Sequence, residues 1–443
     1  MSIEKILKND LCTGCGVCIS EDKSKTAKMV WNDLQFLVPS LTEFSTQSAM
    51  YDVCPFNDNI LNEDDLGNII FKADTKNYND KVGYYNELYA GYSKKFRETS
   101  SSGGIATFIF EKLLNTKIVD YLFIVRENDE GFEYKLCTDL DDIRKISKTR
   151  YMPVTLENLF KEIEKIEGKV AISGVACFVK AVRLKQEKYP ALKIKIPFIV
   201  GIICGGLKSK YYTDFLAQSA GCNSNYSSVQ YRVKKQDSFA IDYKFSCNDK
   251  KSGRIHMVDM LSLGDMWGTG FFKSNACDFC DDVMTELADI SLGDAWIEPY
   301  SKEGLGNSII IARSKLAYEI IESGLKSHDL YLDSLDVHEI MESQKGSYNH
   351  RHHGLKYRMQ HADKKGWLYP KKRQRFINDQ NIFINFVQSS RLKTRINSLK
   401  IWHKYKDVNK FNELIAKDRK RLEFASKVNH RILRVISIFK KII

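Results

Sequence analysis

The spacing of apolar residues predicts alternating helices and strands in the middle of the chain. A helix is expected where apolar residues recur with helical spacing from Ile105 to Leu114, and a buried strand is expected over Val119–Val125. The same reasoning continues the series with helix 156–166, strand 168–174, helix 177–186 and strand 194–203. This alternation is typical of an α/β domain, whose parallel strands end along one edge of the sheet.

Polar and proline-containing segments on either side indicate where domains begin and end. Val38-Pro39, Cys54-Pro55 and the acidic stretch Glu63–Asp65 predict a small first domain that ends near residue 75. From about residue 345 the chain is basic with a helical pattern. The predicted fold class is therefore α/β (α+β), with a small N-terminal domain (1–75), an α/β region in two parts (76–160 and 161–344) and a basic helical tail (345–443).

The tail carries charged runs whose function the sequence leaves open. Near its end, apolar residues with helical spacing alternate with arginines and lysines, at Ile432, Val435, Ile436, Phe439 and Ile442. Such a helix packs on the protein or lies peripherally on an anionic membrane surface, and for charge runs a solvated face is the commoner arrangement. His350–His353 is interpreted as a solvated polar turn, because adjacent histidines point in different directions.

The strongest chemical pattern lies within the first twenty residues. Cys12, Cys15 and Cys18 form a C-x2-C-x2-C run, and the intervening glycines let the backbone curl so that three thiolates face one centre. The only Cys-Pro in the chain is Cys54-Pro55, so Cys54 is expected to be the fourth ligand of a 4Fe-4S cluster. Zinc is the alternative, although structural zinc usually pairs one C-x2-C with a second, separate pair.

A second set of thiols is spread along the α/β region. Cys177 and Cys204 each follow a predicted strand, at the edge of the sheet where ligands gather, and Cys277 and Cys280 form a further C-x2-C. Four thiols make a complete metal site, for which zinc is again an alternative to a cluster. The other cysteines, Cys137, Cys222 and Cys247, have no partner at metal spacing and are interpreted as packing residues without a role.

Serines and glycines precede the helix that begins at Ile105. The stretch Thr99–Gly104 reads Thr-Ser-Ser-Ser-Gly-Gly, and free N–H groups and hydroxyls at a helix N-terminus can hold a phosphate or another anion. Most serine-rich N-termini are only caps, so this feature alone does not establish a ligand site.

Composition narrows the function classes. Eleven cysteines, several in C-x2-C spacing and without a secretory leader before them, indicate metal ligation in the cytoplasm rather than disulfides. Much of the excess that gives a net charge of +12 falls in the tail. The basic stretches lack interleaved aromatics and neither C-x2-C is followed by a histidine pair, so nucleic-acid binding is not expected. The sequence has no apolar run of the roughly eighteen residues that a membrane-spanning helix needs.

Taken in order, these motifs resemble the family of beta subunits of the hydrogenases and formate dehydrogenases that use a deazaflavin coenzyme, which also includes plant hydroxymethyl chlorophyll a reductase. The resemblance covers about residues 10 to 315. The matching segments are Cys12–Cys18 with Cys54-Pro55, Ser101–Gly104, Lys148–Tyr151, Ser173–Cys177, Gly201–Cys204, Tyr231-Arg232, Cys277–Cys280, Ala288–Gly293 and Gly306–Ser308.

Members of that family are iron–sulfur proteins that contain FAD. The resemblance implies that residues 1–75 form a ferredoxin-type 4Fe-4S domain, that 76–160 and 161–344 are two parts of a flavin domain, and that the second cysteine set holds another 4Fe-4S cluster. It also implies a flavin site formed by Ser101, Ser102, Gly103, Gly104, Lys148, Arg150, Tyr151 and Gly174.

The resemblance implies an oxidoreductase. Electrons from a ferredoxin-like or other low-potential donor would enter at the first cluster, cross the second, reduce FAD and reach a small organic acceptor. Similar single-chain members occur among bacterial genes for surface-polysaccharide synthesis, so the resemblance implies flavin and clusters more firmly than the deazaflavin. The alternative is an electron-transfer subunit of a larger complex without its own substrate. The sequence names neither catalytic residues nor the substrate, donor, cluster potentials or oligomeric state.

Overall fold

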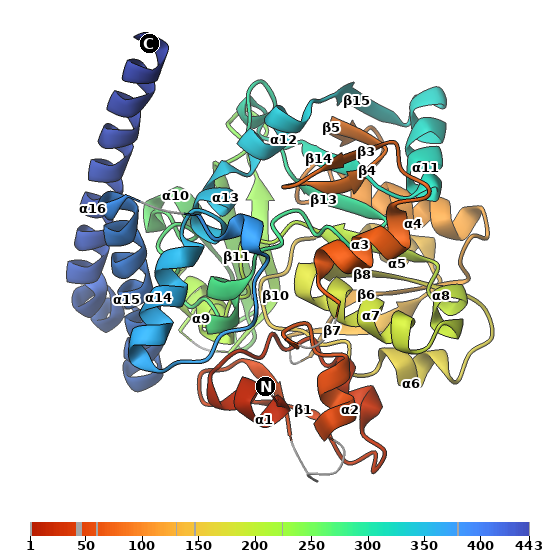
Figure 1. Cartoon of the computed structure of the whole chain (residues 1–443), viewed down its shortest axis with the longest axis horizontal. Coiled ribbons are helices and arrows are strands. Elements are labelled where there is room, and N and C mark those ends of the chain that lie inside the picture. The colour runs from red at the N-terminus through yellow and green to blue at the C-terminus, as the bar shows by residue number, and fades with distance from the viewer. Residues whose placement is uncertain are drawn as a thin grey trace.

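The structure is a computed structural model, and it describes residues 2–40, 47–58, 61–129, 131–145, 148–223, 225–378 and 381–442. Its centre is an eight-stranded mixed sheet in the order β15-β5-β14-β13-β9-β8-β6-β7 (Figure 1). The strands are β5 (Glu87–Ser93), β6 (Tyr121–Asn128), β7 (Gly131–Cys137), β8 (Val170–Val175), β9 (Phe198–Ile202), β13 (Ile290–Asp294), β14 (Ser308–Ala312) and β15 (Leu330–Ser334).

The middle of this sheet is parallel and its flanks are antiparallel. β6, β8, β9 and β13 pair in parallel, whereas β7 and β14 pair antiparallel with the strands beside them. The strands of the middle are almost continuously apolar, as in Phe198–Val200, because both faces of a parallel sheet are covered. Their carboxyl ends therefore open along one edge, where the candidate site lies.

Helices cover both faces of the sheet. α4 (Ile105–Asn115) and α11 (Lys315–Lys326) pack their apolar residues on one face, and α7 (Ala176–Lys188) covers the other. Shorter helices complete this layer, namely α5 (Leu140–Lys145), α6 (Leu159–Ile163) and α8 (Ala191–Lys195). Each face is sealed by aliphatic and aromatic side chains such as Phe108 and Phe178, which are almost fully buried.

The N-terminal segment packs against α7. It contains α1 (Ile3–Lys8), a 3-10 turn η1 (Val17–Glu21), the hairpin β1 (Met29–Trp31) and β2 (Leu37–Pro39), α2 (Gln47–Asp52) and α3 (Glu63–Phe71). A buried ion pair joins this segment to α7, because Lys185 Nζ lies 2.6 Å from Glu21 Oε1. A short hairpin, β3 (Asn77–Asn79) and β4 (Gly83–Tyr85), then leads into the main sheet.

A second, three-stranded sheet stands beside the main one. It consists of β10 (Tyr226–Lys234), β11 (Tyr243–Asp249) and β12 (Ile255–Asp259), all antiparallel, and it packs against α9 (Lys210–Ser219). α10 (Met260–Leu263) follows β12 directly. Three further 3-10 turns, η3 (Asn275–Phe279), η4 (Tyr300–Lys302) and η5 (Gln374–Phe376), lie in the connections.

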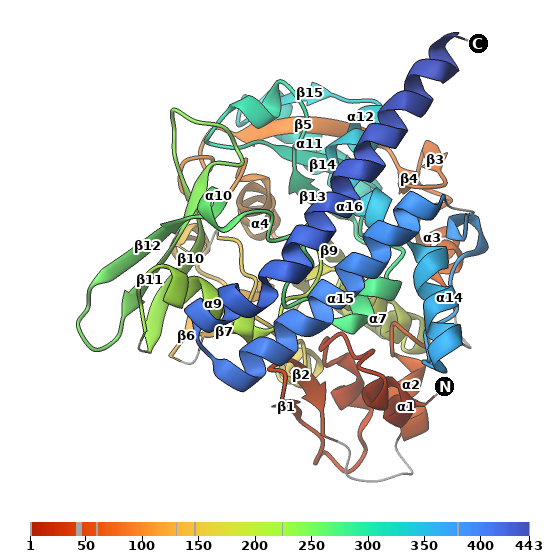
Figure 2. The same cartoon turned by 90° about the vertical axis from the view of Figure 1, so that its left-hand side faces the viewer.

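The C-terminal region is helical, as its pattern predicts. α12 (Val337–Ser343), α13 (Lys345–Arg351) and α14 (Leu355–Lys365) precede a hairpin of two long helices, α15 (Ile382–Tyr405) and α16 (Val408–Ile442). The two long helices run side by side, and the last turns of α16 project from the body (Figure 2). The hairpin is anchored where Trp402 and Phe411 pack on Phe215 of α9.

The amphipathic pattern at the end of the tail falls partly beyond what the structure describes. The side chains of Val435, Ile436, Phe439 and Ile442 lie outside the described residues, so peripheral membrane contact stays a prediction. Among the described helices none combines the length and the apolar character that a membrane span requires.

Two expected elements differ from the structure. The stretch 194–203 is not one strand, because α8 extends to Lys195 and Pro197 separates it from β9. Proline disfavours helical conformation in the residue before it, which ends α8 and allows a strand to begin at Phe198. The helix expected over 156–166 is limited to Leu159–Ile163. The helix at Ile105 and the strands after Val119 and Gly168 are confirmed.

The α16 helix carries a fully buried phenylalanine, Phe411, and an exposed phenylalanine, Phe424. Phe411 is 0% exposed and packs against Phe215 and Trp402. We expect Phe411→Ala to lower the free energy of unfolding by about 3–5 kcal/mol, because truncating a buried aromatic residue leaves a cavity. Phe424→Ala is the matched control, since Phe424 lies on the same helix and is 63% exposed, so its effect should stay within about 0.5 kcal/mol. Chemical denaturation followed by circular dichroism measures both, and equal effects would contradict the observed packing.

Candidate functional site

A large cavity lies at the carboxyl ends of the parallel strands. Its volume is about 900 Å³, within the range of about 300–1,000 Å³ common for small-molecule and cofactor sites. The ends of β8, β9 and β13 contribute to its wall through Ser173–Val175, Ile202–Cys204 and Leu292–Asp294. This is where an α/β sheet is expected to place a ligand.

Seven of the eight residues that the family resemblance assigns to flavin line this one cavity. They come from the segment before α4, from the segment after α5 and from the end of β8, and they are Ser101, Ser102, Gly104, Lys148, Arg150, Tyr151 and Gly174. The eighth, Gly103, does not line it. A side chain at Gly103 would clash with the backbone, because its Cβ would lie 2.6 Å from the Gly91 carbonyl oxygen.

The serines before α4 do not cap the helix as a serine-rich N-terminus suggests. The N-cap is Gly104 in the left-handed conformation, with φ of 79° and no side-chain cap. Ser101 Oγ instead accepts a hydrogen bond from the Thr149 N–H at 2.9 Å, and Ser102 Oγ donates to the Asn307 carbonyl at 3.0 Å. The serines thereby join three segments of the wall, while the first residues of α4, Ile105–Thr107, line the cavity.

The wall between the two sheets is basic and aromatic. Burial lowers the pKa of Lys148 and of Arg150, and Arg150 Nε is buried without a hydrogen-bond partner among the described residues. Tyr151 meets Trp267 edge to face, with ring centroids 4.9 Å apart. Lys208 lies over the Trp267 ring at 4.6 Å, and burial, together with the charge of Lys273, lowers the pKa of Lys208 to about 7. Sequence reasoning missed Lys208 and Trp267, which belong to no recognisable motif.

The thiols of the first cysteine set lie close together and border this cavity. Gly14 and Gly16 both have φ of 74°, which confirms that glycine turns the backbone here. Gly16 also allows close packing, since a Cβ there would lie 2.0 Å from Thr155 Oγ1. Cys54 follows α2 and lies near the other three thiols: burial raises the pKa of Cys18, and the Cys15, Cys12 and Cys54 thiols raise it further. Cys12 and Gly14 line the cavity.

The second cysteine set comes together from three segments. Cys177 lies in the first turn of α7, within the helix expected over 177–186, Cys204 follows β9, Cys277 lies in η3, and Cys280 ends that turn. Burial raises the pKa of Cys177. The neighbouring thiols raise this pKa further, those of Cys280, Cys277 and Cys204 first and that of Cys15, from the first set, to a smaller extent. Two of the sulfurs accept hydrogen bonds from the backbone. The Leu207 N–H donates to Cys277 Sγ at 3.1 Å, and the Gly206 N–H donates to Cys204 Sγ at 3.3 Å. Cys204 also lines the cavity.

The spacing of the sulfurs bears on the metal. A tetrahedral zinc site with Zn–S bonds of about 2.3 Å places its sulfurs about 3.8 Å apart. Within the described part of the chain, neither cysteine set contains three ligand atoms that all lie within 4.8 Å of one another. Both sets are therefore wider than a single zinc ion requires, as suits the larger cage of a cuboidal cluster.

The second set is surrounded by buried charges from the C-terminal region. Arg351 donates to Cys280 Sγ at 3.4 Å, to the Asp282 carbonyl at 2.6 Å and to the Cys204 carbonyl. Arg373 binds Glu286, with Nη1 to Oε2 at 2.8 Å, and Asp281 at 3.4 Å. The basic side chains that contact Asp281 and Asp282 thus come from about seventy residues or more further along the chain.

The histidine run His350–His353 is not the solvated polar turn that was expected. His350 Nε2 lies 3.3 Å from Asp278 Oδ1 and 2.6 Å from Lys273 Nζ, and burial keeps its pKa well below the usual value. His352 is 2% exposed and stacks on Phe376. The expectation failed for His350 and His352 because α13 and the turn after it place them against the loop of the second cysteine set, whereas His353 is exposed. No motif identified Arg351, which lies within this run.

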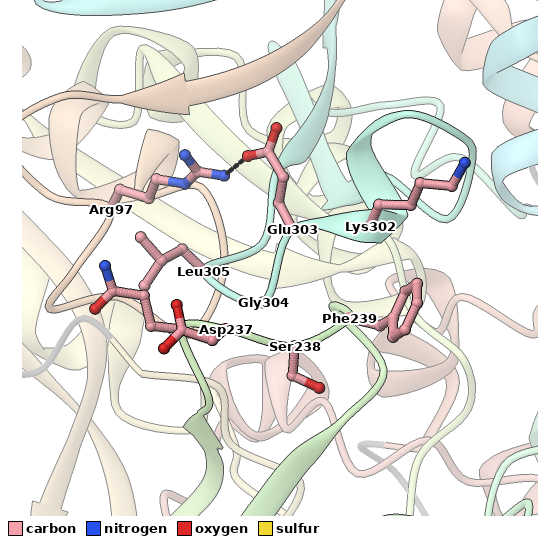
Figure 3. Close-up of a pocket in the computed structure, with 9 residues that line it drawn as sticks. Arg97, Asp237, Ser238, Phe239, Lys302, Glu303, Gly304 and Leu305 are labelled. Atoms are coloured by element: carbon pink, nitrogen blue, oxygen red, sulfur yellow. Dashed lines mark hydrogen bonds and ion pairs between the residues drawn. The ribbon is translucent and has the colours of Figure 1, made fainter.

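A smaller pocket opens elsewhere on the surface. It has a volume of about 390 Å³ and is lined by residues 236–239 after β10, by residues 302–305 from the end of η4 onward and by Arg97, which pairs with Glu303 (Figure 3). None of the residues predicted from the sequence lines this pocket. The large cavity is therefore the candidate site.

Known proteins resemble this chain over the regions that form the site. The family described as "Coenzyme F420 hydrogenase/dehydrogenase, beta subunit" matches in two parts, its N-terminal part at residues 88–161 and its C-terminal part at residues 167–337. One subunit of the F(420)H(2) dehydrogenase of Methanosarcina mazei is 22% identical over 352 residues, which cover 76% of this chain and 87% of that protein. The beta subunit of the coenzyme F420 hydrogenase of Methanothermobacter thermautotrophicus is 22% identical over 247 residues, 52% of this chain and 81% of that protein.

A solved structure supports the fold. A chain of the F420-reducing [NiFe] hydrogenase complex from Methanosarcina barkeri superposes with a TM-score of 0.51 and 19% identity, covering 68% of this chain and all of that chain. The two matched regions together span more than half of the 443 residues and include the strands whose ends form the cavity. The chain therefore belongs to the family of coenzyme F420 hydrogenase/dehydrogenase beta subunits, a family of oxidoreductases.

Proposed function

We propose that this protein is an iron–sulfur flavoprotein that transfers electrons between a ferredoxin-like or other low-potential donor and an organic acceptor. In this proposal, each cysteine set holds a 4Fe-4S cluster and the large cavity holds FAD. The observation that carries the proposal is the position of the cavity, which borders both cysteine sets through Cys12 and Cys204. Bound clusters would supply one-electron carriers and bound FAD the conversion between single electrons and a hydride.

The donor sets fit clusters. Each set offers four thiols and no other ligand type, and soft thiolates favour iron–sulfur clusters or zinc. Burial raises the pKa of Cys277 and Cys280 to about 11, so these thiols carry protons at neutral pH until a metal displaces them. N–H donors to Cys204 and Cys277, and the Arg351 guanidinium beside Cys280, would then compensate the negative charge of the metal-bound thiolates.

The cavity fits FAD by its chemistry. The unpaired Arg150 Nε, Lys148 and the N-terminus of α4 provide positive charge and N–H donors suited to a pyrophosphate. Tyr151, Tyr243, Trp267 and Trp296 provide flat apolar surfaces suited to aromatic rings. These residues would orient the cofactor and exclude water from it.

In the proposed relay, electrons enter at the first cysteine set, cross the second set and reach the flavin in the cavity. Both cysteine sets border the cavity, and the Cys15 thiol is near enough to Cys177 to raise its pKa, after burial and the second set's own thiols. This proximity supports electron exchange between the two sets as well as with the cavity. The acceptor is proposed to be a small organic molecule, with surface-polysaccharide synthesis as a setting suggested by resemblance alone.

A second candidate is an electron-transfer subunit without its own substrate. It is favoured by the names of the relatives, which are subunits of a dehydrogenase and a hydrogenase, and by the hydrogenase complex that contains the structural neighbour. The two candidates differ in whether the isolated chain turns over a small molecule.

Metal content tests the clusters. Anaerobically purified protein should contain iron and sulfide for two cubane clusters, and Cys15→Ser should remove about half of the iron, because serine is a poor soft-metal ligand. Cys277→Ser should remove the other half. Cys137→Ser is the control, since that buried cysteine belongs to neither set, and it should leave iron unchanged. Stoichiometric zinc in place of iron at these sites would refute the cluster assignment.

Flavin affinity tests the cavity. We expect Arg150→Gln to weaken FAD binding by about tenfold to a hundredfold, since a hydrogen bond to a charged group contributes about 1.5–3 kcal/mol. Equilibrium dialysis with flavin fluorescence measures the affinity. Arg419→Gln, on α16 and outside the cavity lining, should bind FAD like the unaltered protein. Unchanged affinity in Arg150→Gln would place the flavin elsewhere.

Isolation under native conditions separates the two candidates. A self-contained enzyme should purify as this chain alone and oxidise a reduced low-potential donor when an acceptor from its own cells is supplied. A subunit should co-purify with a defined partner and reduce no acceptor without it. Size-exclusion chromatography with mass measurement, followed by anaerobic turnover assays, distinguishes these results.

A further inference from the structure

Three side chains of types that can bind metal ions lie close together outside the large cavity, between α9 and the three-stranded sheet. The ligand atoms of Cys222, Asp249 and His256 all lie within 4.8 Å of one another. The Cys222 thiol is 3.8 Å from Asp249 Oδ2. Cys247 lies beside them, because its side chain hydrogen-bonds with that of Cys222 and it pairs across the sheet with His256.

The local structure brings these residues together although they are far apart in sequence. Gly221, with φ of 87°, ends α9 with a turn, and the Cys222 N–H donates to the Ala217 carbonyl at 2.9 Å. Cys247 and Asp249 are two residues apart on β11 and so face the same side. His256 of β12 stands opposite Cys247 and faces the turn, since a Cβ on Gly221 would lie 3.6 Å from His256 Nδ1.

We propose that Cys222, Cys247, Asp249 and His256 form a binding site for a zinc-like divalent cation. Two thiolates, one imidazole and one carboxylate are a donor set that zinc accepts, and bonds of about 2.0–2.3 Å in a tetrahedron separate ligand atoms by about 3.3–3.8 Å. The ligand atoms of Cys222, Asp249 and His256 therefore need only a small contraction to bind one ion, and the Cys247 thiol, which lies outside this group of three, has to move towards it to complete the four. The site differs from the two cysteine sets, whose sulfurs are spread more widely.

The surroundings of Asp249 and the burial of the thiols suit this role. Asp249 Oδ1 accepts hydrogen bonds from the N–H groups of Lys251 at 2.9 Å and Ser252 at 2.8 Å, which directs Oδ2 towards Cys222. Cys222 and Cys247 are 1% and 0% exposed, whereas Asp249 and His256 are half-buried and reachable from solvent. A cation can enter past the two outer ligands and displace one proton from each thiol.

A metal here would fix the second sheet to α9. Four protein ligands complete the coordination, so the site is structural and not catalytic. α9 and the sheet carry Tyr212 and Tyr231, whose rings pack on Tyr151, and Tyr243, which lines the large cavity. The cation would thereby hold one wall of the cavity in place.

The test measures zinc on the full-length protein purified anaerobically, with iron measured in the same samples. We expect one zinc per chain in addition to the iron, and zinc-edge X-ray absorption should show two sulfur and two nitrogen or oxygen neighbours. Cys247→Ser should lose the zinc and keep the iron. His256→Ala leaves the two thiols and the carboxylate in place. It should weaken zinc binding by more than about a hundredfold, which exceeds the loss of about 10–100-fold typical when a residue that only supports a metal ligand is changed.

Two controls separate this site from the others. Cys137→Ser, at a buried cysteine outside the proposed zinc site, should retain zinc, and Cys15→Ser should lose iron yet retain zinc. Zinc that persists in both Cys247→Ser and His256→Ala would overturn the proposal. So would protein that holds no zinc even after incubation with zinc and desalting, or native protein with a Cys222–Cys247 disulfide.

Discussion

The loop that carries Cys277 and Cys280 depends on buried arginines from the other end of the chain. Arg351 and Arg373 are each 6% exposed or less, and they bind Asp281, Glu286 and backbone carbonyls of this loop. Buried carboxylates are costly unless they are paired, so removing one partner leaves an uncompensated charge. The geometry of the second cysteine set thus requires the C-terminal region to be folded in place.

This dependence changes the meaning of the C-terminal region. The sequence resemblance ends near residue 315, and the basic residues beyond it look like a solvated tail. In the structure, Arg351, Arg358 and Arg395 are buried around Asp278 and Cys280, and the hairpin of α15 and α16 packs on α9. The region beyond the matched family segments therefore encloses the site that those segments form.

The features of the site that depend on neighbouring residues were predicted from the sequence, whereas several of those that depend on contacts between distant segments were not. The helix at Ile105, the strands that end near Gly174 and Cys204, and the glycine turns at Gly14 and Gly16 follow from apolar spacing and backbone freedom, which act over a few residues. The break between α8 and β9 was missed because an apolar run alone does not distinguish a helix from a strand.

Contacts between distant segments left no signal in a single sequence. Arg351 meets Cys280 across seventy-one residues, and His350 meets Asp278 only because α13 packs on that loop. Cys222 and His256 were likewise separated by a spacing that matches no metal motif, and sheet register alone brought His256 opposite Cys247. Lys208 and Trp267 reach the cavity wall through the folding of α9 and its neighbours, which residue spacing does not encode.

The central claim is that one cavity lies between two iron–sulfur centres. A crystal structure of the anaerobically purified protein, with anomalous scattering measured at the iron edge, tests it most directly. The account predicts two iron peaks, one within Cys12, Cys15, Cys18 and Cys54 and one within Cys177, Cys204, Cys277 and Cys280, with flavin density between the Arg150 and Trp267 side chains. Iron at only one set, a zinc signal at either set, or a cavity filled by protein side chains would contradict it.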